Sequence, residues 1–157
     1  MDKEGEMKPR NLGEVRREVE NMRDAIGQPV EEKIKPLVIG LRRWGIDTDS
    51  SCQGHLIHGF RYPWVDIPYE DFFEDSEQIR SQRVQARRTQ ELMKAWQIKS
   101  KNSWILDWIF RPHGFLRLMP QNRSRWKLRK MQKDVIEFGK FLQELPEDRF
   151  KKSSPSI

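Results

Sequence analysis

An apolar stripe near the end of the chain is the feature that most constrains the fold. Its members recur at alternating spacings of three and four, which is the pattern of one helix face; they are Leu128, Met131, Val135, Phe138, Leu142 and Leu145. Ser124 is suited to cap this helix, and Pro146 ends it. A helix of this kind is stable only when its apolar face packs against another layer. The rest of the chain must therefore supply that layer.

Two hairpins are predicted to form it. Large apolar side chains stand at every second position of residues 104–110, and they are Trp104, Leu106, Trp108 and Phe110. Residues 111–114 (Arg-Pro-His-Gly) suit a type I turn into a return strand over 115–119. Asp107 is the one charged residue in an otherwise apolar strand, and it is predicted to face solvent or to pair with Arg117. Residues 46–52 and 63–69 predict the other hairpin, around a loop with two glycines.

Three further helices complete the fold. One follows Asn11, a suitable N-cap, and runs to Gly27; a second covers residues 34–45 and either begins or bends at Pro36; a third runs from residue 75 or 76 to about 98. The predicted order is α-α-β-β-α-β-β-α. This is an α+β fold, with a four-stranded, mainly antiparallel sheet and helices on one face.

Composition indicates one domain, over residues 1–150, with a loose tail at 151–157. Residues 1–27 are expected to be peripheral or to pair with a second copy. Charged residues make up 34% of the chain, but six Trp and eight Phe provide an aromatic core. One cysteine and the lack of an apolar signal segment after Met1 predict a cytoplasmic protein. No apolar run is long enough to insert across a membrane, whereas association with its surface stays open.

Residues 48–58 hold the best candidate site. Cys52, His55 and His58 follow the pattern C-x-x-H-x-x-H, whose sulfur and imidazole donors suit zinc or another divalent transition metal. Cys52, His55 and Asp66 are also candidates for catalysis, with a histidine activating the thiol or a carboxylate orienting the imidazole. Four neighbours are candidates for binding a ligand: Thr48, Ser51, Gly54 and Trp64. The alternative is structural: Cys52 is a small core residue and Gly54 shapes a loop.

The run from Pro36 to Ile67 resembles a family of small bacterial and phage proteins. The shared pattern is Pro-Leu-Val, then Gly-Ile-x-Thr-x-x-Ser-Cys-x-Gly-His, then proline, an aromatic and aliphatic residues, and it covers about residues 34–68. This resemblance implies no established activity. A fainter likeness links Thr48, Ser51, Cys52 and Gly54 to the wybutosine-synthesis tRNA methyltransferase family, in which arginine stands at the place of His55. That likeness points toward RNA.

Charge is distributed unevenly along the chain. Residues 45–75 contain seven acidic residues and one basic, whereas residues 76–133 contain fifteen basic residues and three acidic. Basic residues near an aromatic side chain suit phosphate neutralisation and base stacking, and the candidates for nucleic-acid binding are Arg123, Arg125, Lys127, Arg129 and Lys130. Such helices are also common as solvated surface.

The sequence thus leaves three functions open. The favoured one is a domain that binds a metal or small ligand at the Ser-Cys-Gln-Gly-His segment, with or without enzymatic activity. The second is an RNA-binding accessory protein that uses the basic helices. The third is a homo-oligomeric assembly module that pairs through residues 11–26, because the apolar stripe of that helix is thin.

Overall fold

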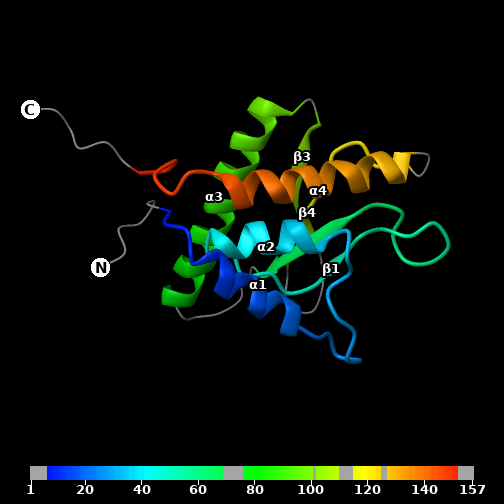
Figure 1. The fold of residues 1–157 in the computed structure, drawn as a ribbon, viewed down its shortest axis with the longest axis horizontal. Coiled ribbons are helices and arrows are strands. Elements are labelled where there is room, and N and C mark those ends of the chain that lie inside the picture. The colour runs from blue at the N-terminus through cyan, green and yellow to red at the C-terminus, as the bar shows by residue number, and fades with distance from the viewer. Residues whose placement is uncertain (1–6, 69–75, 101, 110–114, 125–126, 152–157) are drawn as a thin grey trace, which may run out of the picture.

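The computed structural model describes residues 7–68, 76–100, 102–109, 115–124 and 127–151 (Figure 1). Its helices are α1 (Leu12–Asn21), α2 (Lys35–Arg43), α3 (Ser76–Lys99) and α4 (Leu128–Glu144). Its strands are β1 (Ser51–Cys52), β2 (Trp64–Pro68), β3 (Trp104–Ile109) and β4 (Phe115–Pro120). The predicted α+β class and element order are confirmed.

The four strands form one antiparallel sheet in the order β1-β2-β4-β3. The two predicted hairpins join through β2 and β4, where Val65 lies opposite Leu118. β1 is shorter than residues 46–52, the strand predicted from the sequence. Before it, the Asp49 amide donates to the Asp66 carbonyl while the Asp66 amide donates to the Ser50 carbonyl. Asp49 and Ser50 therefore both lie opposite Asp66, as in a β-bulge. The regular pairing of β1 is limited to Ser51 and Cys52.

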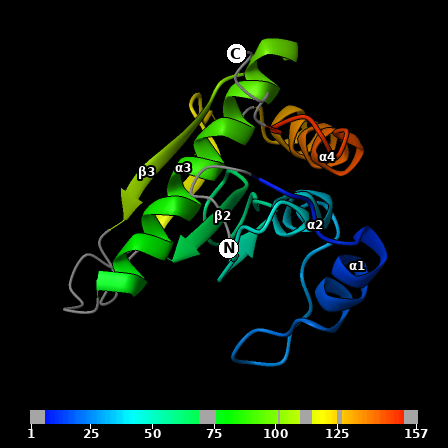
Figure 2. The ribbon, with the colours of Figure 1, turned by 90° about the vertical axis from the view of Figure 1, so that its left-hand side faces the viewer.

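Helices α2 and α4 lie side by side and pack over the apolar face of the sheet (Figures 1 and 2). Glycine allows their close approach: a Cβ added at Gly139 would come within 2.3 Å of the Pro36 carbonyl carbon. Phe138 of α4 stacks on Trp96 of α3, with 5.3 Å between ring centroids, and meets Trp104 of β3 edge-on. These contacts join three helices and the sheet in one aromatic core.

Helix α1 packs on α2 within the same chain. The predicted cap is confirmed, since the Asn11 side chain accepts a hydrogen bond from the Glu14 amide. The helix ends at Asn21 rather than near Gly27, because Asp24 then forms a turn in which its carboxylate accepts from the amides of Ile26 and Gln28. Val15 and Val19 are buried in the chain's own core. Little of the stripe thus remains for a second copy.

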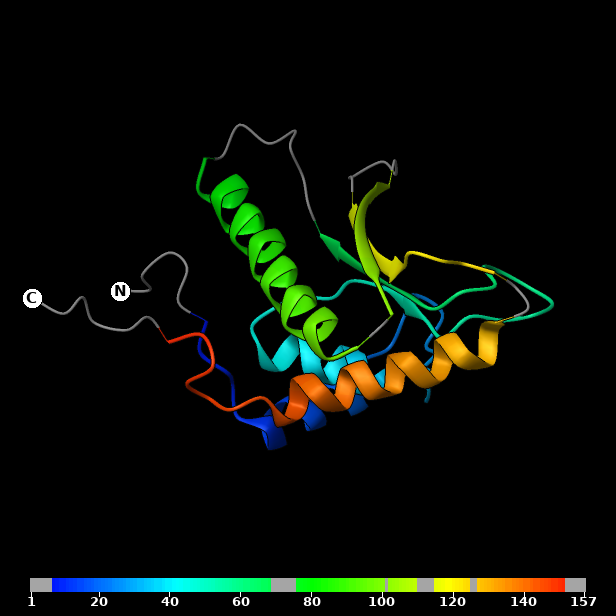
Figure 3. The same cartoon turned by 90° about the horizontal axis from the view of Figure 1, so that it is seen from above.

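Several predicted features fall elsewhere or outside the described residues. α4 begins at Leu128 rather than after Ser124, with Lys127 at the cap position and no side-chain cap. The start of α3 was predicted correctly, and its N-terminal part rises away from α4 (Figure 3). The predicted turn at 111–114, Arg125 and most of the tail lie outside the described residues. Within the described part, no helix is both long and apolar enough to cross a membrane.

Candidate metal centre

Three potential metal ligands converge at the loop end of the first hairpin. They are Glu31, from the loop before α2, Cys52 at the end of β1, and His55 in the following loop. One donor atom from each (a carboxylate oxygen, the thiol sulfur and an imidazole nitrogen) lies within 4.8 Å of the other two. Among the described residues this is the only such group. Two of its members were predicted from the sequence, whereas Glu31 was not.

Gly54 makes this convergence possible. Its φ of +86° lies in the left-handed region that glycine adopts without steric cost. A Cβ at this position would also come within 2.7 Å of Leu128 Cδ1 and 2.9 Å of the Tyr62 carbonyl carbon. The chain therefore turns sharply after Cys52, and the His55 amide donates to the Phe60 carbonyl at 3.0 Å to close the loop. Gly54 thus shapes the loop through its backbone, and its contact with a ligand stays a prediction.

Glu31 holds the loop from the opposite side. One of its carboxylate oxygens accepts from the Gln53 amide at 3.0 Å, and the other lies 2.7 Å from His55 Nε2. The Lys33 amide in turn donates to the Gln53 side chain at 3.0 Å. No spacing in the sequence links Glu31 to Cys52, because the two meet only after α2 has folded between them.

The environment of Cys52 favours the neutral thiol. Burial raises the pKa of Cys52 to about 11, and the nearby Glu31 carboxylate adds to the rise. The Gly54 amide, which donates to Sγ at 3.3 Å, and Arg117 act in the opposite direction without offsetting it. Because the thiolate is the reactive form, Cys52 is a poor nucleophile at neutral pH. A metal cation would counter both the burial and the carboxylate.

His58 stands differently from the other predicted ligands. Its ring stacks on that of His55, with 4.2 Å between centroids and an interplanar angle of 25°. The residue is exposed, and it does not belong to the group of donor atoms described above. The donor atoms that lie together are therefore those of Glu31, Cys52 and His55, and two of these residues belong to the predicted set Cys52, His55 and His58.

Asp66, a catalytic candidate from the sequence, does not belong to this group of donor atoms and is engaged by other residues. Its carboxylate receives two hydrogen bonds from Arg117, at 2.7 and 3.0 Å, and one from the Ser50 hydroxyl at 3.3 Å. Both ions of the pair are almost fully buried. The Arg117 guanidinium also lies 3.8 Å from the centre of the Trp64 ring and 5.0 Å from that of Phe60. Asp66 therefore links β2 to β4 through Arg117 and to the segment before β1 through Ser50.

An open pocket of about 560 Å³ adjoins the donor group. Glu31 lines it together with three of the four predicted ligand-binding residues, Thr48, Ser51 and Trp64. The indole Nε1 of Trp64 is buried, and within the described part of the chain it has no hydrogen-bond acceptor. Buried donors of this kind usually have a hydrogen-bond partner, either a protein group or an ordered water molecule.

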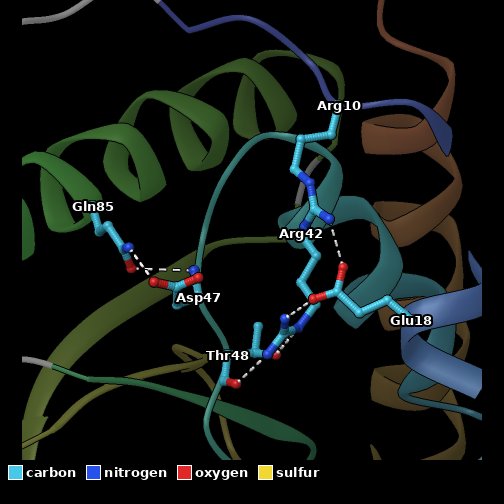
Figure 4. Close-up of polar contacts among 6 residues, drawn as sticks. All are labelled: Arg10, Glu18, Arg42, Asp47, Thr48 and Gln85. Atoms are coloured by element: carbon cyan, nitrogen blue, oxygen red, sulfur yellow. Dashed lines mark hydrogen bonds and ion pairs between the residues drawn. The ribbon is translucent and has the colours of Figure 1, made fainter. Parts of the chain in front are cut away.

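Thr48 is held in place by a chain of charged contacts from α1 (Figure 4). Its hydroxyl accepts from Arg42 Nε at 2.8 Å, and its carbonyl accepts from the same guanidinium at 2.8 Å. Arg42 is bound by Glu18, which also pairs with Arg10. Thr48 is therefore a fixed part of the pocket wall, and its hydroxyl oxygen already accepts a hydrogen bond from Arg42.

The predicted nucleic-acid residues lie around the start of α4. Arg123, Lys127, Arg129 and Lys130 are exposed, whereas Arg125 lies outside the described residues. Lys127 and Lys130 also line a smaller cavity of about 280 Å³ next to the buried Asp134. The exposed positions agree with a solvated basic surface as well as with a binding one.

Comparison of the chain with protein-family models, with curated proteins and with solved structures gives no match. Function is therefore argued from the geometry of the chain itself. The donor group, its adjoining pocket and the basic surface are the three features that enter that argument.

Proposed function

We propose that the protein binds a divalent transition metal, zinc in the first place, through Glu31, Cys52 and His55. The observation that carries this proposal is the approach of the three donor atoms to within 4.8 Å of one another. A carboxylate, a thiolate and an imidazole are all established zinc ligands, and their combination of soft and borderline donors disfavours magnesium and calcium.

The number of ligands supports a site with an exchangeable position. Structural zinc sites are closed by four protein ligands, whereas sites that act on a substrate keep three and leave one position open. The pocket beside Glu31 would give a small ligand access to that region, with Ser51 and Trp64 in its wall. We therefore propose a metal-dependent ligand-binding domain, whose open fourth position would also allow catalysis.

The proposed metal must displace the proton of Cys52. The pKa of this thiol is raised to about 11, so at neutral pH nearly all of it is protonated before binding. Below that pKa, the affinity for the metal should therefore rise about tenfold for each unit by which the pH is raised, because one proton leaves this thiol on binding. It should fall as the solution is acidified.

The test is to titrate tag-free protein with Zn²⁺ by calorimetry and with Co²⁺ by absorption, because thiolate-bound cobalt has a characteristic charge-transfer band. We expect one metal per chain, and we expect loss of at least tenfold in affinity for each of Cys52→Ser, His55→Gln and Glu31→Gln. His58→Gln is the matched control. It removes the neighbouring imidazole of the same loop and should change affinity by less than about threefold.

Two results would overturn the assignment. One is the absence of a cobalt–thiolate band at saturating metal. The other is a larger loss for His58→Gln than for Glu31→Gln, which would favour the ligand set predicted from the sequence instead.

A further inference from the structure

The loop between β1 and β2 exposes apolar side chains on an ordered tip. Leu56 is 62% exposed, Ile57 95% and Phe60 45%. These are three of the five large apolar residues that are markedly exposed in the described part of the chain. The His55–Phe60 backbone hydrogen bond and the left-handed Gly59 fix the tip in a tight turn. An ordered loop that presents such residues to water marks an interaction site.

This tip lies beside the basic start of α4. The Gln132 side-chain amide donates to the Gln53 carbonyl at 3.0 Å, and Leu128 packs against Gly54. The Arg123 guanidinium lies 5.5 Å from the centre of the Tyr62 ring, at the returning end of the loop. Figures 1 and 3 show the loop and the first turns of α4 at the same end of the molecule. The apolar tip and the basic residues therefore form one surface.

The charge of this surface is mainly positive, with the exposed Glu137 at its border beside Arg129 and Lys133. Its exposed basic residues are Arg61, Arg123, Lys127, Arg129, Lys130 and Lys133. Residues 53–63 contain no acid, and residues 121–136 contain only Asp134. Asp134 is 5% exposed and accepts hydrogen bonds from Trp104 and Asn102, so it does not contribute a surface charge. Glu31, at the base of the loop, is engaged by His55.

We propose that this surface docks on an anionic lipid membrane, with Leu56, Ile57 and Phe60 entering the headgroup region and the basic residues contacting lipid phosphates. Peripheral membrane binding usually combines these two contributions, because buried apolar area alone or charge alone gives weak attachment. The two occur here on adjacent segments. The docking is reversible and does not require any element to span the bilayer.

The tip itself favours lipid over nucleic acid. Stacking of bases requires free aromatic faces, but Arg123 lies over Tyr62 and Arg117 lies over Phe60. The most exposed side chains, Ile57 and Leu56, are aliphatic and have no stacking face. Acyl chains accept such side chains, whereas a phosphodiester backbone offers them no partner.

The experiment is flotation of the full chain with vesicles of phosphatidylcholine alone and of phosphatidylcholine mixed with phosphatidylglycerol. We expect binding to the mixed vesicles only, and a decrease as salt concentration rises. Leu56→Ser with Ile57→Ser should weaken binding on the order of tenfold or more. Lys127→Glu with Arg129→Glu should have an effect of similar order.

Each variant has a matched control on α3. Ile98 is 81% exposed, so Ile98→Ser removes an equally exposed aliphatic side chain from a different surface. Arg87→Glu reverses an exposed charge there. Neither control should change vesicle binding, and all variants should keep the wild-type melting temperature.

Three outcomes would overturn the proposal. They are the absence of binding to the mixed vesicles, equal binding by the Leu56 and Ile57 variant, and an equal loss in the α3 controls. Salt-dependent binding to single-stranded RNA, lost with Lys127 and Arg129 but unaffected by Leu56 and Ile57, together with no vesicle binding, would assign the surface to nucleic acid instead.

Discussion

The two faces of the sheet are built on different chemistry. On the face toward the helices, Val65, Ile67 and Leu118 contribute to the continuous apolar core. On the opposite face, the same strands bury the Asp66–Arg117 ion pair, with aromatic rings over the guanidinium. The apolar face distributes its stability over many side chains, whereas the polar face depends on one charged pair. The donor group lies on the polar side, since Cys52 pairs with Trp64 and shares its face.

The largest expected effect is on the polar face. Asp66→Ala leaves the buried Arg117 without its partner, and loss of one ion of such a pair costs about 3–5 kcal/mol. Asp107→Ala is the control, because Asp107 lies opposite Arg117 on the other neighbouring strand but is exposed. It should change stability by less than about 0.5 kcal/mol. Urea unfolding of both variants measures the difference, and equal losses would contradict the contrast between the faces.

The next effect concerns the Cys52 thiol. Its pKa of about 11, compared with 9.0 for an ordinary cysteine, implies about a hundredfold less thiolate at neutral pH. Alkylation by iodoacetamide should therefore be slow in metal-free protein, and its rate should rise with pH to a midpoint near 11. Glu31→Gln removes a charge that raises this pKa, so the midpoint should decrease. A midpoint at the ordinary value in wild-type protein would show that burial does not control the thiol.

A smaller effect is expected on the apolar face. Alanine usually stabilises a helix by about 1 kcal/mol relative to glycine. At Gly139 we expect the opposite sign, a loss of about 1–3 kcal/mol, because a methyl group would overlap the backbone at Pro36 and Leu37. Lys140→Ala, at the exposed neighbouring position, should be nearly neutral. Stabilisation by Gly139→Ala would mean that α2 and α4 pack less closely.

The smallest effect lies at the edge of the molecule. Burial acts to raise the pKa of Glu18, but Arg10 and Arg42 outweigh it and hold the pKa below its usual value. Because the folded-state pKa is depressed, this contribution is present above the unfolded pKa of 4.5 and is lost as the pH falls through the folded value. Glu18→Gln should cost below about 1 kcal/mol at neutral pH, since the pair is partly exposed. The cost should vanish in acid, as melting temperatures at several pH values would show.

Local sequence patterns predicted the helices and strands better than they predicted the contacts between these elements. The stripe of α4 and the alternation of β3 depend on neighbouring residues, and both were predicted correctly. The extent of β1 was wrong because a bulge is set by its partner strand. The sequence left Asp107 either facing solvent or pairing with Arg117. Asp107 is exposed, and the pairing of β2 with β4 brings Asp66 to Arg117.

The candidate site follows the same rule. Cys52 and His55 lie three positions apart, so their proximity could be inferred from a loop containing glycine. Glu31 reaches them only through the fold, because its loop is set by α2 and by contacts with Gln53. The proximity of the basic start of α4 to the apolar loop likewise depends on packing between distant segments.

The contacts of Gln132 have a mechanical consequence. This one side chain on α4 holds the carbonyls of Gln53 and Gly54, which stand between the thiol and the imidazole. A movement of the first turns of α4 should therefore change the distance between Cys52 and His55. A ligand bound to the thiol and the imidazole would in return restrain that end of the helix. The position of α4 and the geometry of the donor group are therefore coupled.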